Sequence, residues 1–295
     1  MTRKDTVGSI YRYLIHQLSL AEIENPQLEA RILLAHAAEI DQTRIIGYPE
    51  DKLDKYTIKY LNKIITRRKN YEPIAYITGT KEFWSLDFEV THKTLIPRPD
   101  SEILIEFILG SITNYNEDLS ILDLGTGSGC LLLALLSELP NANGTGIDIS
   151  PSACGIARRN ARKLGLDNRA KFYQGNWMEN VQHQFDIIVS NPPYIAEPDI
   201  KFLDKDVMLF EPHLALSGGP DGLSAYRVIA KECITCLKQS GILAVEIGIS
   251  QAQNICNIFA RNGLIITKIQ RDLSNIERCI LATVEQSKKI SAIKV

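Results

Sequence analysis

From about residue 120 onward, short apolar segments alternate with segments of helical periodicity, and this alternation most constrains how the chain can fold. Helical patterns begin near Gly129, Pro151, Gly222 and Ser250. Strands that alternate with helices in this way are typical of an open, mostly parallel sheet covered on both faces. The candidate strands are residues 121–124, 145–149, 171–173, 185–189, 242–247, 264–269 and 279–284.

The segment before this region has a different pattern. Apolar residues recur at helical spacing through residues 5–70, which predicts a small helical module over residues 1–73. The last predicted helix ends in a basic stretch, Lys59–Lys69, which is either a solvated face or a docking surface for an acidic or RNA-bound partner. Aromatic and β-branched residues around Gly79 then indicate a β-hairpin linker, residues 74–94, before the α/β region of residues 95–288.

Overall charge and hydropathy exclude several classes of protein. The net charge is −2 and the pI about 6.2, whereas proteins that bind nucleic acid through phosphate contacts are usually strongly basic. No apolar stretch reaches the length of a membrane span, and the N-terminus lacks the apolar core of a signal peptide. The five histidines have no metal-ligand spacing, so no metal site is expected. A cytoplasmic location without membrane contact is the expectation.

A glycine-rich turn follows the first predicted strand, where residues 123–129 read Asp-Leu-Gly-Thr-Gly-Ser-Gly. Glycines there let the backbone approach a ligand closely, and the helix that follows offers free amide groups. A dinucleotide enzyme can use a similar loop, but its spacing is G-x-G-x-x-G rather than G-x-G-x-G. The carboxylate of Asp123 would repel a pyrophosphate and attract the ammonium and sulfonium groups of S-adenosylmethionine. This is therefore the predicted ligand, bound by Gly125, Thr126, Gly127, Ser128 and Gly129.

Two later strand ends add polar and aromatic residues to this predicted site. Asp148, at the end of the next strand, is placed to bind both ribose hydroxyls, and Ile149 would lie against the adenine. Asn176 and Trp177 follow the third strand, where an amide can bond the adenine edge and an indole can pack on its ring. Alternatively, Asp148 only caps a helix and Trp177 only fills the core.

The fourth predicted strand ends in Asn191-Pro192-Pro193-Tyr194, which suits methyl transfer to a planar NH2 group. The Asn191 side-chain oxygen and the Pro192 carbonyl can accept its two N–H groups, and Pro193 cannot donate a competing one. Tyr194 can stack on the planar group. Asn191, Pro192 and Tyr194 are thus the predicted catalytic residues, and Asn191 to Tyr194 the predicted substrate-binding residues.

With these motifs, nearly the whole chain resembles the HemK/PrmC family of protein-(glutamine-N5) methyltransferases. Further similar segments are 72–79, 82–84, 95–100, 210–212 and 219–223. The resemblance implies a class I, Rossmann-like methyltransferase fold with a seven-stranded, mostly parallel sheet, preceded by a helical substrate-docking module. It also implies that Asn191–Tyr194 bind a substrate glutamine, and that the glycine loop, Asp148, Trp177 and Asn191 meet the cofactor. Asn176 departs from the family, which more often has Asp there.

The resemblance implies class 1 release factors of bacterial type as the partner, modified at the glutamine of their Gly-Gly-Gln motif. A related branch modifies a ribosomal protein, and it has Pro-Arg-Ser-Pro where this chain has Pro-Arg-Pro-Asp at residues 97–100. The same motifs would also suit an adenine or cytosine methyltransferase, or a binding module without activity. A nucleic-acid enzyme usually carries a basic target-recognition segment, which this chain lacks, and a binding module would not explain why every motif is intact.

Overall fold

The computed structural model describes residues 5–284 and divides into two compact units. One contains Met1–Thr80 together with Asp204–Phe210, and the other contains Lys81–Leu203 and Glu211–Val295. The end of the α/β region expected at residue 288 lies outside the described residues.

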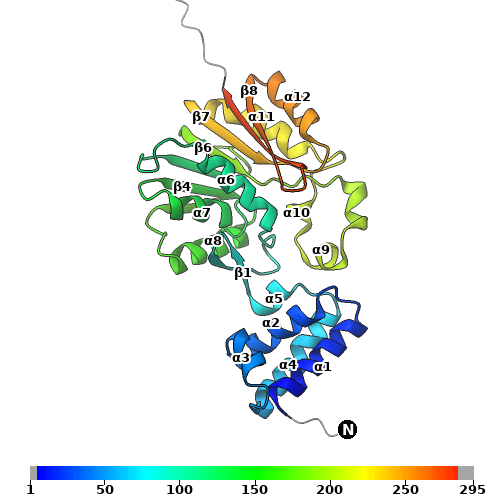
Figure 1. The fold of residues 1–295 in the computed structure, drawn as a ribbon. Helices are drawn as coiled ribbons and strands as arrows, with labels where there is room; N and C mark the ends of the chain where they lie inside the picture. The colour runs from blue at the N-terminus through cyan, green and yellow to red at the C-terminus, as the bar shows by residue number, and fades with distance from the viewer. Residues whose placement is uncertain (1–4, 285–295) are drawn as a thin grey trace, which may run out of the picture. The chain divides into compact units, whose positions relative to one another are not determined.

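The first unit is helical (Figure 1). Its elements are α1 (Val7–Leu20), α2 (Pro26–Ala38), α3 (Gln42–Gly47), α4 (Lys55–Lys69), α5 (Ile74–Thr78) and α9 (Lys205–Phe210). Thr6 and Ser9 form a capping box at the start of α1, and the Asp54 side chain caps α4. Apolar side chains at helical spacing, including Leu14, Leu18 and Ile64, meet in one buried cluster.

The basic end of α4 has a structural role within the helical unit. Its last three cations contact other side chains of this unit: Arg67 contacts Glu72, Arg68 contacts Glu29, and Lys69 contacts Gln17. Arg68 is only 7% exposed, so loss of Glu29 would leave a buried cation without its carboxylate. Lys59 and Lys63 remain exposed. A docking surface on this helix would therefore depend on these two lysines and on Lys55, also exposed, rather than on its C-terminal turn.

The β-hairpin is shorter than the sequence suggested. It consists of β1 (Thr80–Phe83) and β2 (Leu86–Glu89), joined by Trp84 and Ser85, both of which have positive φ. Such a two-residue turn matches the twist of the flanking strands. Ile74–Thr78, which we expected to belong to this linker, forms helix α5 instead. Pro73 precedes its first turn and Gly79 ends it at φ +77°, and these two signals outweigh the aromatic and β-branched composition.

The second unit has the class I methyltransferase fold that we predicted. Seven strands form one sheet in the order β5-β4-β3-β6-β7-β9-β8, parallel except for the pairs that β9 makes with β7 and β8. The strands are β3 (Ser120–Leu124), β4 (Asn143–Asp148), β5 (Ala170–Gln174), β6 (Phe185–Ser190), β7 (Leu237–Glu246), β8 (Leu264–Arg271) and β9 (Glu277–Val284). All seven coincide with candidate strands, although β7 begins five residues earlier than its candidate.

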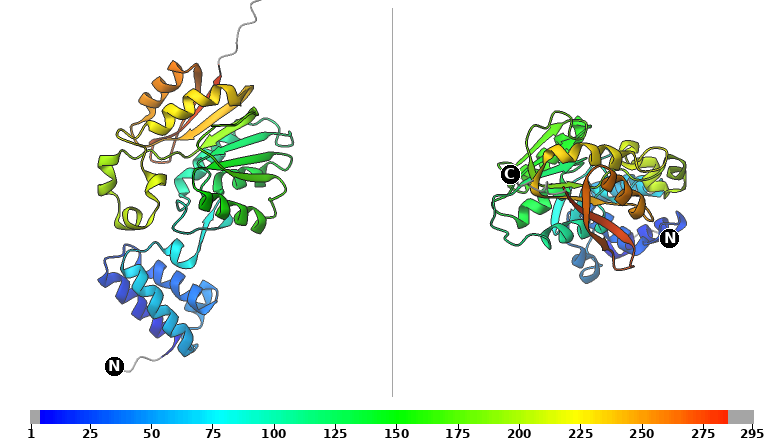
Figure 2. Two further views of the ribbon diagram at one scale, coloured as in Figure 1. Left: turned by 180° about the vertical axis from the view of Figure 1, so that it is seen from behind. Right: turned by 90° about the horizontal axis from the view of Figure 1, so that it is seen from above.

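Helices cover both faces of this sheet, as opposite views show (Figures 1 and 2). Neighbouring residues of a strand point to opposite faces, so Ile121 joins one buried cluster and Leu122 the other. The first cluster includes α6 (Glu102–Leu109), α7 (Cys130–Glu138) and α8 (Pro151–Lys163), and the second includes α11 (Ser224–Cys236) and α12 (Ala252–Arg261). Shorter helices are η1 (Pro99–Ser101), η2 (Glu197–Phe202) and α10 (His213–Leu216).

Strand register brings the predicted motifs to one edge of the sheet. Leu124 of β3 pairs with Ile147 of β4 and with Ser190 of β6. Gly125, Asp148 and Asn191 each come one residue later, so they emerge side by side at the carboxyl ends of three adjacent strands. β4 and β6 pair with opposite edges of β3, so the strand order changes direction here. Ligands of open α/β sheets bind at such a point.

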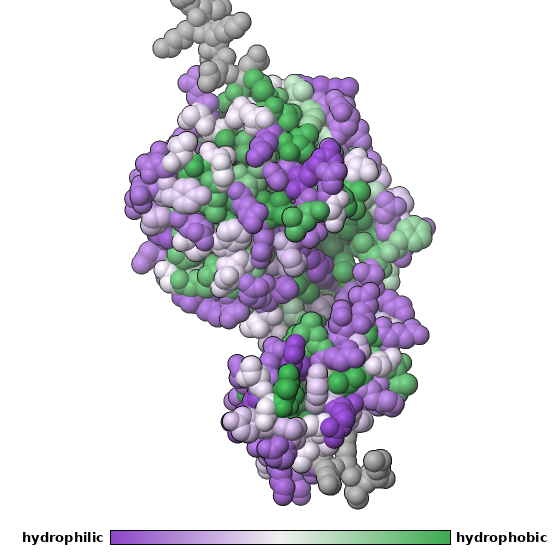
Figure 3. All heavy atoms as spheres, viewed as in Figure 1, coloured by the Kyte–Doolittle hydropathy of each residue, from purple (hydrophilic) through white to green (hydrophobic). Residues whose placement is uncertain are grey.

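The surface drawn in Figure 3 mixes hydrophilic and hydrophobic residues on both units. Within residues 5–284, no helix has the length and apolar character needed to cross a membrane.

Candidate active site

A cavity of about 790 Å³ lies over the carboxyl ends of β3, β4 and β6, within the second unit. Its volume falls within the range typical of small-molecule sites, about 300–1,000 Å³. Of the predicted site residues, it is lined by Gly125, Gly127, Asp148, Ile149, Asn176, Trp177, Asn191 and Pro193. Thr126, Ser128, Gly129, Pro192 and Tyr194 are not among its lining residues.

Backbone hydrogen bonds fix the conformation of the glycine loop. The amides of Gly125 and Thr126 both donate to the Ile147 carbonyl, at 2.9 and 3.0 Å. Gly125, Gly127 and Gly129 have φ of +70°, +55° and +83°, a region that side chains with a Cβ rarely adopt. A Cβ at Gly129 would also lie only 3.1–3.3 Å from Ala157, Leu133 and Phe172. The glycines therefore shape this wall of the cavity and pack the loop against its neighbours.

The side chains between these glycines turn into the protein. Thr126 and Ser128 are 4% and 2% exposed, and the Thr126 hydroxyl donates to Asp123 Oδ2 at 2.6 Å. Asp123 is itself buried, and burial raises its pKa to about 7. We expected the Asp123 carboxylate at the mouth of the loop, facing a cationic ligand. It is instead 1% exposed and is not among the residues that line the cavity, and its Oδ2 holds the Thr126 hydroxyl within the loop.

Asp148 joins the loop to the next helix. Its Oδ2 accepts the Gly127 amide at 2.9 Å, and its Oδ1 accepts the Ser150 amide at 2.8 Å. Burial raises the pKa of this carboxyl, and the two amide hydrogen bonds oppose that shift. Asp148 also lines the cavity, whereas the N-cap of the next helix, α8, is Ser150, whose hydroxyl accepts the Ala153 amide. The alternative that Asp148 only caps this helix is therefore wrong, and ligand binding by Asp148 stays a prediction.

The third strand end contributes an aromatic wall. Trp177 has φ +52°, which is uncommon for a bulky side chain and places it where it both lines the cavity and packs against a buried cluster. Asn176 lines the same part of the cavity, and Ile149, 55% exposed, offers apolar surface there. These residues suit a flat heteroaromatic ring with a polar edge.

The backbone that carries Asn191–Tyr194 is fixed by a second glycine-rich segment, Gly218–Gly222. The Ile195 carbonyl accepts the Gly218 amide at 2.8 Å, and the Tyr194 carbonyl accepts Gln251 Nε2 at 2.9 Å. A Cβ at Gly218 would lie 2.7 Å from the Pro193 carbonyl oxygen, and one at Gly222 would lie 2.4 Å from that of Tyr194. Only glycine permits this close approach, so Gly218–Gly222 packs directly against the backbone of Asn191–Tyr194 and fixes its position.

Behind Asn191 lies a chain of buried hydrogen bonds. Asn191 Nδ2 donates to Ser101 Oγ at 3.0 Å, and Ser101 Oγ donates to Glu246 Oε2 at 2.5 Å. The Tyr194 hydroxyl donates to the other oxygen of Glu246 at 3.4 Å, and its ring packs against the second buried cluster. Burial and the charge of Glu246 raise the pKa of Tyr194. In this structure Tyr194 thus supports the site from behind rather than facing the cavity.

An ion pair with a buried carboxylate, Glu211, connects two further motifs near the cavity. Glu211 Oε1 accepts from Arg98 Nη2 at 2.5 Å, and its Oε2 accepts the Ile96 amide at 3.2 Å. The flanking residues Leu95 and Pro212 line the cavity. The pair therefore holds the 95–100 segment and the 211–217 segment together as one wall.

Sequence reasoning missed Ser101, Glu246 and the role of Gly218–Gly222. Glu246 left a readable signal, because it lies within the candidate apolar strand 242–247, where a carboxylate needs partners if it is buried. Ser101 left none, since serine after a Pro-Asp pair is common at a helix start. Within the described residues, no group of three or more His, Cys, Asp or Glu side chains could hold a metal ion.

Known proteins match the chain along most of its length. Residues 9–79 match the model of the PrmC N-terminal domain, and residues 115–290 match that of a methyltransferase domain. The release factor glutamine methyltransferase of Rhodospirillum rubrum is 42% identical over 90% of this chain and 81% of its own. The protein of that name from Caulobacter vibrioides is 41% identical over 90% and 92%. A methyltransferase structure from Pyrococcus furiosus, 18% identical, shares the fold with a TM-score of 0.51 over 75% of this chain and 96% of its own.

Proposed function

The chain belongs to the family of release factor glutamine methyltransferases, and we propose that it methylates the side-chain amide nitrogen of the Gly-Gly-Gln glutamine in class 1 release factors of bacterial type. The observation that carries this proposal is the position of Asn191 beside the glycine loop and Asp148, on one cavity. That arrangement brings an amide acceptor next to a site for a methyl donor. Release factors act on ribosomes, so a cytoplasmic location is part of the proposal.

S-Adenosylmethionine fits the donor side of the cavity and supplies an electrophilic methyl group when bound. Asp148 would hold its ribose, and Ile149, Asn176 and Trp177 would surround its adenine. Gly125 and Gly127 leave room for its remaining portion, because neither carries a side chain and both line the cavity. No cation lies in the glycine loop to bind a phosphate, although Lys93 is among the residues that line the cavity.

On the acceptor side, the protein contributes position rather than acid–base chemistry. Asn191 donates through its NH2 group to Ser101, which leaves its Oδ1 to accept from a ligand. That oxygen can accept one N–H group of a planar amide, and the Pro192 carbonyl would accept the other, although Pro192 is not among the residues that line the cavity. Holding that weak nucleophile in line with the methyl group is worth about 7–11 kcal/mol when the geometry is good. The resulting proton on nitrogen can pass to solvent after transfer.

The helical unit gives the proposal its protein partner. Lys59, Lys63 and Tyr56 are exposed on α4 and are available to contact a folded factor. A short peptide that carries only Gly-Gly-Gln could not use such a surface. We therefore propose that the intact release factor, rather than the tripeptide motif, is the substrate.

Transfer of a labelled methyl group tests the proposal against its competitors. The wild-type chain is incubated with labelled S-adenosylmethionine and one acceptor at a time. The acceptors are an intact release factor, a Gly-Gly-Gln peptide, ribosomal proteins and a DNA oligonucleotide. We expect rapid labelling of the factor and slow labelling of the peptide. Labelling of DNA or of a ribosomal protein, with the factor unlabelled, would reject the proposed substrate.

A further inference from the structure

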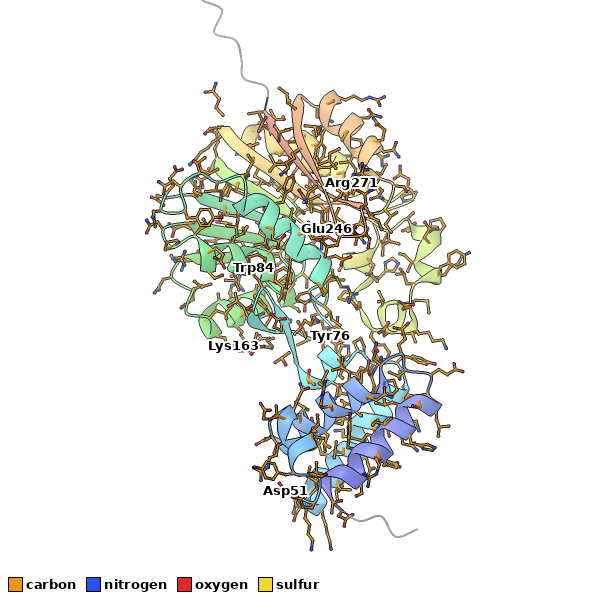
Figure 4. The ribbon with its side chains drawn as sticks, in the orientation of Figure 1. Asp51, Tyr76, Trp84, Lys163, Glu246 and Arg271 are labelled. Atoms are coloured by element: carbon orange, nitrogen blue, oxygen red, sulfur yellow. The ribbon has the colours of Figure 1, made fainter. Side chains whose placement is uncertain are left out.

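Glu246, labelled in Figure 4, is a buried carboxylate that does not line the cavity. It is the last residue of β7 and is only 3% exposed. Both carboxylate oxygens point to partners of the acceptor site, Ser101 and Tyr194, while its backbone carbonyl accepts the Tyr226 hydroxyl at 2.8 Å. A buried carboxylate is costly unless its partners hold it, so its presence here calls for a role.

The supply of hydrogen-bond protons between Glu246 and Asn191 determines how the Asn191 amide is oriented. An ionised carboxylate only accepts hydrogen bonds, and a serine hydroxyl has a single proton to donate. Ser101 gives that proton to Glu246, so it can offer Asn191 nothing but a lone pair. Asn191 must therefore turn its NH2 group towards Ser101, as the 3.0 Å contact has it. The amide oxygen of Asn191 then faces the other way.

We propose that Glu246, acting through Ser101, is a positioning residue that fixes the Asn191 amide with its oxygen towards the substrate nitrogen. The inference rests on the proposed function and extends it to how the site selects an amide. A substrate NH2 group donates to an oxygen but is repelled by another NH2 group. The orientation of one side chain, set two hydrogen bonds away, therefore decides whether glutamine can bind productively.

Protonation of Glu246 would reverse the direction of both hydrogen bonds. A neutral carboxyl can donate to Ser101, and Ser101 can then donate to Asn191, which turns the Asn191 NH2 group towards the substrate. Burial raises the pKa of Glu246 to about 7, although its bonds to Ser101 and Tyr194 and the nearby Arg278 favour the anion. The other charged or titratable groups around it are Asp100, Tyr226, Cys130 and Cys279. Because the anion is the active form, turnover should fall as pH drops through about 7.

Substitutions at Glu246 and at Ser101 test this chain of hydrogen bonds from Glu246 through Ser101 to Asn191, which we call the relay. Glu246→Gln places a neutral amide that can donate to Ser101, so it imitates the protonated state at every pH. We expect kcat to fall by about 10²-fold, the size of effect that a misplaced reacting group produces, with the acid limb of the pH profile lost. Ser101→Ala should lower kcat by about tenfold through loss of the constraint on Asn191. Ser101→Thr, which keeps the hydroxyl, should have a kcat close to that of the wild type.

The measurements are kcat and KM for the intact release factor across pH, together with the melting temperature and the affinity for S-adenosylmethionine. Glu138→Gln serves as the control, because it removes a carboxylate that bonds the Trp84 indole away from the cavity. A Glu246→Gln variant that keeps the wild-type acid limb, or a Ser101→Thr variant as slow as Ser101→Ala, would overturn the relay. Failure of the wild-type chain to methylate the factor would instead show that the proposed function is wrong.

Discussion

The two halves of the candidate active site are built in different ways. On the donor side, hydrogen bonds from its own backbone amides hold the glycine loop, such as the bond from Gly127 to Asp148, 21 residues further along the chain. On the acceptor side, Asn191 is positioned by side chains that lie 90 and 145 residues apart in successive bonds, through Ser101 and Glu246. The donor side is thus held by backbone bonds between two adjacent strand ends, whereas the acceptor side is held by side-chain bonds of much longer range, which orient Asn191. Substitutions in the two halves should therefore affect different measured quantities.

The largest effect is expected from Asn191→Ala. The variant loses the acceptor that aligns the substrate nitrogen, and loss of one preorganised catalytic hydrogen bond typically costs about 10²–10³ in rate. Turnover assays should show this loss in kcat, while calorimetry should show affinity for S-adenosylmethionine within a few-fold of wild type. A kcat close to wild type would make Asn191 a structural residue.

Asp148→Ala should produce the opposite pattern. Loss of a charged hydrogen-bond partner costs about 1.5–3 kcal/mol, so affinity for S-adenosylmethionine should weaken at least about tenfold. The rate at saturating methyl donor should change much less. Asp87→Ala, which removes an exposed carboxylate on β2, is the matched control. Unchanged affinity in a folded Asp148→Ala protein would remove Asp148 from the ligand site.

A third comparison separates backbone conformation from close packing in the glycine loop. Gly129 and Gly165 both have positive φ, but only Gly129 has atoms within 4 Å of an added Cβ. Alanine should cost about 1–2 kcal/mol at either position, and a further ~1–3 kcal/mol at Gly129 from overpacking. Urea unfolding of both variants measures the difference. Equal losses would mean that the loop yields to the added methyl group.

The last comparison concerns the pH dependence that the buried carboxyl of Asp123 confers. Burial raises the folded-state pKa of Asp123 to about 7, above its ordinary value of 3.8. The folded state therefore holds this proton more tightly, and the group's stabilising contribution is lost as pH rises from about 4 to about 7. Asp123→Asn removes that dependence, so its melting temperature relative to wild type should rise by a few degrees from acid to neutral pH. A constant difference across pH would contradict the shift.

The contrast between the halves also explains what could be predicted from the sequence. The strands were predictable because each is a short apolar run between turn signals, and the glycine loop and Asp148 because each directly follows a strand. The start of β7 at Leu237 was not, since Gly241 within it resembles a turn. The relay was not predictable either, because Ser101, Asn191 and Glu246 meet only after three distant segments have folded together. Local patterns therefore located the donor side, whereas the support of the acceptor side required the structure.

The most direct test of the account is where the methyl group goes. Intact release factor is incubated with the wild-type chain and S-adenosylmethionine, digested, and sequenced by mass spectrometry beside a factor whose Gly-Gly-Gln glutamine has been replaced by glutamate. The account predicts one added methyl on the side-chain nitrogen of that glutamine and none on the glutamate factor, because a carboxylate would face the Asn191 oxygen with no proton to donate. An unmodified glutamine, or equal methylation of the two factors, would contradict it.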